Sequence, residues 1–309
     1  MRFNIFSVLF ALLLFCGNTL SSQTIPKEEL IFLTSEWKGE RFDDGRPKIS
    51  DNLIERAKRI AIDDAWTVLK NQGYTNQFEG NWRRVHDEVP IVGRALTVMY
   101  MPSRPDVVKN IKERGINEQG RKGDTNTWPI EMLGKGDVYV ADGFGKIDAG
   151  TLMGATLATA IYSRTGTGVI FNGSARDLEA VKQMKGFNAF VRDFHPSFLE
   201  DMVAMGINTP IRIGGVMVLP GDLVLAKEEG VLFVPAHLAD QVVSIAEFVS
   251  LKDQFGFEAV KTRMYTTGEI DGQWTEKVKS DFLKWLGNHP ELGSMTKEHL
   301  DKVLSDRTW

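Results

Sequence analysis

The sequence predicts an α/β protein in which strands and helices alternate within one core domain. Three short apolar runs, at residues 137–141, 168–172 and 187–191, have the length and composition of buried strands. Helical segments of about ten residues separate them, a spacing typical of β-α-β units. After Pro210 the pattern changes to short strands joined by turns, which adds an all-β part to the same core.

The composition limits the classes of protein and site to consider. The chain has 309 residues, of which 42% are hydrophobic and 25% charged, as in a soluble globular protein. A single Cys excludes a disulfide framework and a Cys-rich zinc site, and the five His form no HExxH or HxH pair. Any divalent metal would therefore bind carboxylates, as Mg²⁺ or Mn²⁺ does. The net charge of -4, without a dense Lys/Arg run, disfavours a nucleic-acid binder.

The first 22 residues are predicted to be a secretory signal peptide. A charged start, the apolar run Ile5–Phe15 and small residues at the exit fit cleavage after Ser21 or Ser22. The apolar run is too short for a membrane span, which needs about 20 residues, so no stable span is expected after cleavage. Cys16 raises the alternative of a lipoprotein, which the bulky residue before it disfavours. We expect an exported protein, periplasmic or secreted.

The elements expected before residue 137 follow from caps, periodicity and breakers. They are a short helix at 26–37 within an N-terminal extension (23–49), a longer helix from Ser50 to Gly73, a strand at 93–100, and a polar loop at 102–127 with one helical turn.

The second half of the chain contributes the remaining helices and strands. The expected helices are at 154–164, 178–185 and 235–248, and the expected strands are at 211–213, 216–219, 223–226 and 231–234. One amphipathic helix in the tail presents Val278, Phe282, Trp285 and Leu286 on one face, which the protein's own core or a neighbouring chain must cover. We expect the core domain to span 50–250 and a helical C-terminal extension to span 251–309.

Two motifs bear on chemistry. Thr165–Gly168 resembles a nucleotide-binding loop, but it follows a helix and leads into a strand, so we interpret it as a helix C-cap and turn. Arg176-Asp177 follows a predicted strand and opens a helix, which is where α/β proteins place ligands. Asp177 could hold a hard cation and Arg176 a substrate carboxylate. Alternatively, Asp177 caps the helix and Arg176 forms a surface ion pair. His195 is interpreted as structural or solvated.

Several segments together resemble the family of RraA-like proteins and 4-hydroxy-4-methyl-2-oxoglutarate aldolases. The segments that carry the resemblance are GDVYVADGFG (136–145), GATLATA (154–160), GVIFNGSARDLEAV (168–181), FNAFVRDFHPS (187–197) and IGGVMVLPGDLVLAKEEGVLFVP (213–235).

The resemblance implies a swivelling β/β/α fold, assembled as a homotrimer or homohexamer with active sites between subunits. It also implies a divalent cation, Mg²⁺ or Mn²⁺, as cofactor. By this resemblance Asp177 binds the metal, Arg176 binds the carboxylate or enolate oxygen of the substrate, and backbone amides near Thr156 and Leu157 complete the carboxylate pocket.

The sequence departs from the family's pattern at the acidic position that precedes Arg-Asp by twenty intervening residues. Ala155 stands there and cannot hydrogen-bond a metal-bound water. Lys227 also stands where the family often has Asp. Asp142 or Asp148 are candidates for the missing carboxylate.

The resulting functional hypothesis is a metal-dependent, class II-type aldolase or oxaloacetate decarboxylase-like lyase. It would cleave a small 2-oxo acid through a pyruvate enolate stabilised by the cation and Arg176. The alternative is a non-catalytic exported binding or regulatory protein on the same scaffold, and Ala155 is the feature that favours it.

Overall fold

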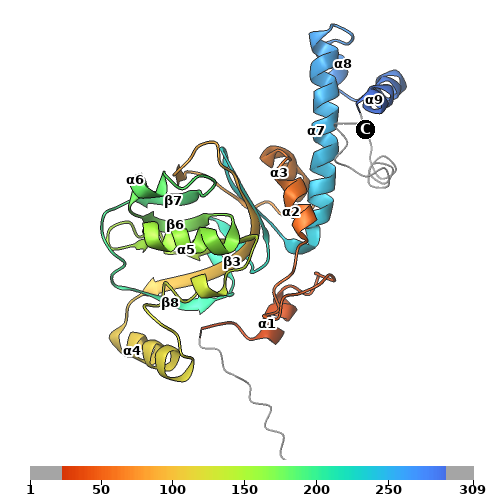
Figure 1. Cartoon of the computed structure of the whole chain (residues 1–309). Helices are drawn as coiled ribbons and strands as arrows, with labels where there is room; N and C mark the ends of the chain where they lie inside the picture. The colour runs from red at the N-terminus through yellow and green to blue at the C-terminus, as the bar shows by residue number, and fades with distance from the viewer. Residues whose placement is uncertain (1–22, 290–309) are drawn as a thin grey trace, which may run out of the picture.

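The computed structural model describes residues 23–289. The predicted signal peptide and residues 290–309 lie outside this part of the chain. The predicted α/β fold with helices at both ends is confirmed: helices cover a large mixed sheet, and a long helix projects away from it (Figure 1).

The sheet contains ten strands within residues 23–289. The strands are β1 (Phe78–Glu79), β2 (Arg83–Arg84), β3 (Ile91–Pro102), β4 (Asp137–Asp142), β5 (Thr151–Met153), β6 (Val169–Ala175), β7 (Ala189–Phe194), β8 (Met202–Ile207), β11 (Leu223–Lys227) and β12 (Gly230–Val234). Their order is β1-β12-β11-β3-β4-β6-β7-β2, with β5 beside β6 and β8 beside β3. The central strands β3, β4, β6 and β7 run parallel, as the β-α-β pattern predicts.

A small hairpin and the helices complete the fold. The hairpin pairs β9 (Ile211–Ile213) with β10 (Val216–Val218). The helices are α1 (Lys27–Leu33), α2 (Asp51–Ala57), α3 (Ile62–Asn71), α4 (Pro105–Glu113), α5 (Ala155–Thr165), α6 (Leu178–Val181), α7 (Ala239–Lys261), α8 (Thr267–Asp271) and α9 (Glu276–Asn288).

Helix α5 ends where the sequence predicts a C-cap and turn. Gly166 adopts a left-handed conformation with φ of 66°, and its amide donates to the Tyr162 carbonyl. This conformation favours glycine, which lacks a Cβ. The Thr165–Gly168 segment is therefore a helix terminator, and the interpretation against a nucleotide loop is confirmed.

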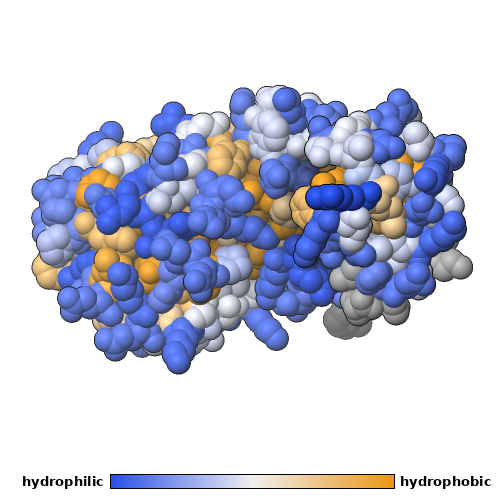
Figure 2. Space-filling model, turned by 90° about the horizontal axis from the view of Figure 1, so that it is seen from above, coloured by the Kyte–Doolittle hydropathy of each residue, from blue (hydrophilic) through white to orange (hydrophobic). Residues whose placement is uncertain are grey.

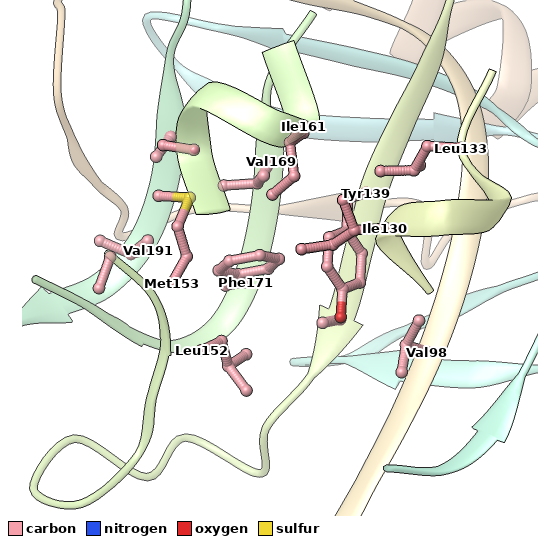
Figure 3. Close-up of a cluster of buried hydrophobic side chains, with 14 of the residues drawn as sticks. Val98, Ile130, Leu133, Tyr139, Leu152, Met153, Ile161, Val169, Phe171 and Val191 are labelled. Carbon is pink, nitrogen blue, oxygen red and sulfur yellow. The ribbon is translucent and has the colours of Figure 1, made fainter. Parts of the chain in front are cut away.

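The core beneath α5 is built from the inward faces of the parallel strands. Tyr139 of β4 and Phe171 of β6 are fully buried, and their rings meet edge to face at 5.0 Å between centroids. Figure 3 shows Leu152 and Met153 of β5 beside Phe171. These two β5 residues belong to the core and also form part of the floor of the cavity described below.

The single helix predicted from Ser50 to Gly73 is wrong, because the chain forms two helices, α2 and α3, separated at residues 58–61. The Lys227 ammonium, at the end of β11, donates to the carbonyls of Lys58 (3.2 Å) and Ile60. In a continuous helix those two carbonyls would have accepted hydrogen bonds from backbone amides four residues further along. Lys227 is thus a structural residue at this break.

Residues 102–127 contain more helix than the single turn predicted. Helix α4 begins with Pro105 in its first turn, a favourable place for a residue without an amide hydrogen, and continues as a π-helical turn over Arg114–Glu118. Four strands, β1, β2, β5 and β8, are also absent from the prediction. β1 and β2 have two residues each and β5 has three, and the six residues of β8 do not alternate between buried and exposed.

Helix α7 is longer than the predicted helix at 235–248, and the expected boundary at residue 250 falls inside it. Its first half packs with α2 and α3 over β11 and β12. Its second half packs against α8 and α9 through a separate apolar cluster (Figure 1). Val278 and Phe282 of α9 are buried there, against Phe248 and Phe255 of α7. The amphipathic tail face is therefore covered by the protein's own chain.

Within residues 23–289, no helix combines the length and apolar character needed to cross a bilayer. The face seen from above in Figure 2 is mostly hydrophilic, with hydrophobic residues gathered in smaller areas between the hydrophilic ones.

Candidate active site

A cavity of about 390 Å³ lies beside the start of α5 and the end of β6. The floor comes from β5, one wall from the α5 start and the Arg176-Asp177 pair, and another from the loop between β7 and β8. The segment from α4 to Asn126 closes the remaining side. The four residues to which the sequence assigns binding roles, Thr156, Leu157, Arg176 and Asp177, all line this cavity.

The Arg176-Asp177 pair is held by hydrogen bonds at the end of β6. The Arg176 amide donates to the Met153 carbonyl at 3.0 Å, which joins the pair to β5. Asp177 has φ of 59° and ψ of 37°, a left-handed conformation that costs a non-glycine residue about 1–3 kcal/mol. Residues held this way cluster at functional sites, because the surrounding structure must enforce the conformation.

The Asp177 side chain does not cap the helix that it precedes. It accepts no capping hydrogen bond from α6, so the structure contradicts the interpretation of Asp177 as a helix cap. Its Oδ2 accepts from the Ala155 amide at 2.9 Å, at the start of α5. The carboxylate is thereby turned toward the cavity, where its side chain is 43% exposed.

The first turn of α5 supplies hydrogen-bond donors to the same cavity. Gly154 is the N-cap residue and makes no side-chain cap, so the first amides of the helix depend on other partners. The Ala155 amide is bonded to Asp177. The next two amides, of Thr156 and Leu157, belong to residues that line the cavity. Helix N-termini favour anions, so a carboxylate is a suitable partner for these amides.

Arg176 is oriented by an aromatic ring. Its guanidinium carbon lies 4.4 Å from the centroid of Phe198, in the loop after β7. Its Nε lies 3.9 Å from Oδ2 of Asp177, too far for a strong hydrogen bond. This cation–π contact holds the guanidinium beside the ring and does not use its N–H groups, which can therefore bind a ligand.

The single carboxylate of Asp177 suits a metal ion whose other ligands are waters or substrate oxygens. Asp177 is the carboxylate that meets the start of α5, and no group of three His, Cys, Asp or Glu residues clusters within residues 23–289. Mg²⁺ commonly binds proteins through one or two carboxylates and keeps several waters or substrate oxygens. Asp177 therefore fits Mg²⁺ or Mn²⁺ in an open site, whereas Zn²⁺ would require more protein ligands.

The residues considered for the missing carboxylate lie elsewhere. Asp142 accepts hydrogen bonds from the Phe144 amide and the Asn172 side chain, and does not line the cavity. Asp148 is 83% exposed and lies 3.6 Å from His195, also outside the cavity. The interpretation of His195 as structural fits its Nδ1 contact with Ser197 Oγ at 2.9 Å.

Sequence reasoning missed the outer wall of the cavity. Phe198, Lys112 and Asp124 line it, and Lys112 Nζ is paired with Asp124 Oδ1 at 2.5 Å. The sequence signal for Phe198 is its position two residues after the His-Pro pair that follows β7. Lys112 and Asp124 lie in the segment interpreted as a loop, so no periodicity assigned them a direction.

Comparison with known proteins identifies the family. A family model described as RraA-like, Aldolase/RraA, matches residues 47–233. The chain belongs to the RraA-like family. The match covers both the parallel strands and the antiparallel β11–β12 part of the sheet, so the resemblance noted in the sequence is confirmed.

Curated relatives of this RraA-like chain include proteins named as aldolases. Residues of the chain are 32% identical to the 4-hydroxy-4-methyl-2-oxoglutarate aldolase of Thermus thermophilus over 107 residues, 34% of this chain and 63% of that protein. They are 24% identical to protein DlpA of Legionella pneumophila over 201 residues, 64% of this chain and 29% of DlpA. The chain thus spans less than two thirds of either relative.

Solved structures support the fold. The RraA-family protein RraAS2 of Streptomyces coelicolor, described as an unusual member of the RNase ES inhibitor RraA family, aligns with a TM-score of 0.59 at 23% identity. The alignment covers 68% of this chain and 99% of that one. A structure described as a novel cellulase from gut-associated microbes aligns with a TM-score of 0.59 at 19% identity, over 74% of this chain and 96% of that one. At such identities the likeness concerns the fold alone.

Proposed function

We propose that this protein is a divalent-metal-dependent lyase that cleaves a small 2-oxo acid through a pyruvate enolate. The observation that carries the proposal is the convergence of Arg176, Asp177 and the α5 N-terminus on one cavity. Some curated relatives are named as 4-hydroxy-4-methyl-2-oxoglutarate aldolases, which supports the reaction type.

The roles of the residues follow from their chemistry. Asp177 would hold Mg²⁺ or Mn²⁺, which when bound would supply Lewis-acid polarisation of the 2-oxo group. Arg176 can form two parallel hydrogen bonds to a carboxylate, or donate to the single developing enolate oxygen. The amides of Thr156 and Leu157 would bind the second carboxylate oxygen. Oxaloacetate decarboxylation passes through the same enolate and is a proposed side activity.

Cleavage breaks the bond between C3 and C4 of the 2-oxo acid. The C4 hydroxyl gives its proton to water as C4 becomes a carbonyl, and in oxaloacetate C4 leaves as CO₂. The electron pair of the broken bond remains on the pyruvate fragment, where negative charge develops on the enolate oxygen near Arg176. The cavity lining within residues 23–289 contains no His, so we assign protonation of the enolate carbon to water.

The test separates metal binding from substrate binding. Asp177→Ala is expected to abolish Mn²⁺ binding measured by calorimetry, while its melting temperature stays near that of the wild type. Arg176→Ala is expected to retain Mn²⁺ and to weaken 2-oxo acid binding by about 2 kcal/mol, the lower end of the range for a lost charged partner. The lower end applies because the Arg176 side chain is 31% exposed.

Asp148→Ala is the matched control, because Asp148 is an exposed carboxylate outside the cavity. It is expected to bind Mn²⁺ as the wild type does. If the wild type binds no Mn²⁺ and releases no pyruvate from 2-oxo acids, the lyase proposal fails. The alternative of a non-catalytic exported binding or regulatory protein then takes its place.

Export and assembly are separate proposals. The predicted signal peptide supports a periplasmic or secreted protein, and mature protein from the envelope should begin at Ser22 or Gln23; an intact Met1 would contradict this. We also propose a homotrimer or homohexamer, which the family resemblance supports. The tail face of α9 no longer supports it, since α7 covers that face. A monomer mass by light scattering at micromolar concentration would contradict it.

A further inference from the structure

A second cavity, separate from the candidate active site, lies where the N-terminal extension meets the sheet. Its walls come from the end of α1 and the residues after it, the loop between α3 and β1, strand β10 and the segment that follows β12. Its volume is about 270 Å³, just below the lower end, about 300 Å³, of pockets that enclose drug-sized ligands. The second cavity therefore suits a small molecule.

Much of the second cavity is built from parts of the chain that the family model does not match. Glu36 and Trp37 precede the matched residues 47–233, and His237 follows them. The second cavity also shares no lining residue with the cavity at Arg176 and Asp177. It is therefore a product of how the extensions of this chain pack on its core, and the proposed lyase reaction does not use it.

Among the described residues, three aromatic rings line the second cavity, those of Trp37, Tyr74 and His237. Tyr74 Oη lies 3.2 Å from His237 Nε2, and the two rings meet at 60° with their centroids 6.1 Å apart. The Trp37 indole donates its N–H to the Glu40 carbonyl at 2.7 Å. Because the Tyr74 hydroxyl and the indole N–H already have partners in the protein, the rings offer mainly their surfaces to a ligand.

The acidic groups of the lining have no basic counterpart there. Glu36 and Asp222 contribute carboxyl groups, and no Lys or Arg lines the second cavity within residues 23–289. Burial lowers the pKa of His237, against the opposing effect of Glu36, so its imidazole is mainly uncharged at neutral pH. Burial also raises the pKa of Asp222 to about 7, and a positive charge nearby would favour the ionised form of this carboxyl.

Aromatic rings and carboxylates together form a binding environment for organic cations. The face of an aromatic ring carries partial negative charge and attracts a cation, most strongly where water is excluded. Elsewhere in the chain such rings are covered by the protein's own cations. The Arg192 guanidinium lies 4.0 Å from the centroid of Trp82, and the Lys70 ammonium lies 5.0 Å from that of Trp66. In the second cavity the lining supplies the rings and the carboxyl groups, and a ligand has to supply the cation.

We propose that the second cavity binds a small organic cation, of the quaternary ammonium class, against the rings of Trp37, Tyr74 and His237. The exposed carboxylate of Glu36 supplies the opposing charge. Apolar side chains, among them Met217, complete the lining. They suit an ammonium group whose charge is covered by methyl groups, because such a group needs no hydrogen-bond acceptor for each of its substituents.

Choline and its uncharged analogue 3,3-dimethylbutan-1-ol test the role of charge, because the two molecules have nearly the same shape. With the full chain at pH 7, calorimetry is expected to give choline a dissociation constant about 3- to 30-fold below that of the alcohol, the range for cation–π contacts. Equal affinities would show an apolar pocket without cation recognition and would overturn the proposal. So would a failure of choline to bind at millimolar concentration.

Variants of the aromatic residues identify the contacts responsible. Trp37→Leu is expected to weaken choline binding by about 3- to 10-fold. Trp66→Leu is the matched control, because Trp66 lies on α3 outside the second cavity, and it should leave choline binding unchanged. Tyr74→Phe keeps the ring and should bind choline within about twofold of the wild type, whereas Tyr74→Leu should lose as much as Trp37→Leu. Equal losses in Trp37→Leu and Trp66→Leu, or in the two Tyr74 variants, would overturn the assignment to the rings.

The role of the carboxylate is tested on the same extension. Glu36→Gln is expected to weaken choline binding by about two- to fourfold and to leave binding of the uncharged alcohol unchanged. Glu28→Gln is the matched control, because Glu28 is exposed in the first turn of α1 and does not line the second cavity. If Glu36→Gln and Glu28→Gln weaken choline binding equally, the effect is one of overall charge, and the assignment of Glu36 is wrong.

Asp177→Ala separates this inference from the lyase proposal, since Asp177 does not line the second cavity. Choline is expected to bind this variant as tightly as it binds the wild type. A loss of choline binding in Asp177→Ala would place the cation in the candidate active site and would overturn the proposal. A wild type that binds choline but neither Mn²⁺ nor 2-oxo acids would contradict the lyase proposal and leave the second cavity as a cation site.

Discussion

Replacing Glu247 should destabilise the protein through the charge that it leaves behind. Glu247 of α7 accepts hydrogen bonds from Arg56 of α2, at 2.7 Å from Nη2 and 3.1 Å from Nε. Both residues are buried, at 5% and 8% exposure. Hydrogen bonding to Glu247 raises the pKa of Arg56 above its already high ordinary value, so Arg56 stays charged at neutral pH.

The size of the effect follows from these contacts. Removing one partner of a buried ion pair typically costs about 3–5 kcal/mol, because the remaining charge is left without water or a counterion. Asp240 lies 3.5 Å from Arg56 and is 65% exposed, so it compensates only in part. We therefore expect Glu247→Leu to lower the free energy of unfolding by about 3 kcal/mol. Replacing both residues, as Arg56→Met with Glu247→Leu, should recover most of this loss.

Urea unfolding of the single and double variants measures the coupling between the two residues. Glu55→Gln is the matched control, since Glu55 lies on the same helix as Arg56 and forms an exposed pair with Lys58. Its replacement should cost less than about 0.5 kcal/mol. A loss in Glu247→Leu no larger than in Glu55→Gln would refute the reasoning. So would a double variant that is less stable than Glu247→Leu alone.

Two further predictions concern carboxylates. Ala155→Asp should tighten Mn²⁺ binding by about 10–100-fold, because it adds a hydrogen-bond acceptor beside Asp177. It should also raise any rate of pyruvate formation. Calorimetry measures the affinity for Mn²⁺, and an unchanged value would contradict the prediction. Burial raises the pKa of Asp222 to about 7, so the native state holds this proton more tightly than the unfolded chain, with its pKa of about 3.9. The contribution of Asp222 to stability is therefore present at acidic pH and lost as pH rises from about 4 to 7. Asp222→Asn should flatten that decline in urea unfolding, and an identical pH slope would count against it.

The alternation of apolar strands and helices was enough to predict the parallel centre of the sheet. The run at 137–141 is apolar after its first residue and is buried throughout, and the helix at 154–164 ends at a glycine C-cap, so neighbouring residues carry the information that defines both elements. The break at residues 58–61 could not be predicted in this way, because the amine that binds its carbonyls belongs to Lys227, far along the chain.

The candidate site also contains features that the sequence predicts and features that it does not. Arg176-Asp177 could be located from the sequence, because the ends of parallel strands meet at one edge of a sheet. The direction of the Asp177 side chain could not be predicted, because it depends on a hydrogen bond from the Ala155 amide at the start of α5, 22 residues earlier in the chain. Phe198 lies in the loop between β7 and β8, and Lys112 lies in helix α4. Both reach the cavity through tertiary packing, which no local pattern encodes.

The geometry of Asp177 bears on what the family's missing acidic residue would change. In this chain position 155 acts through its backbone amide, which any residue except proline supplies, and that amide orients Asp177. Ala155 therefore lacks the side-chain acceptor that an acidic residue would supply at this position, while its amide still orients the Asp177 carboxylate that would bind the metal. Metal binding and proton handling are thus separable at this site. A wild-type protein that binds Mn²⁺ but turns over slowly, and gains rate in Ala155→Asp, would show that position 155 serves the reaction of bound substrate. If the wild type binds no Mn²⁺ and the Ala155→Asp variant does, position 155 contributes to metal binding itself.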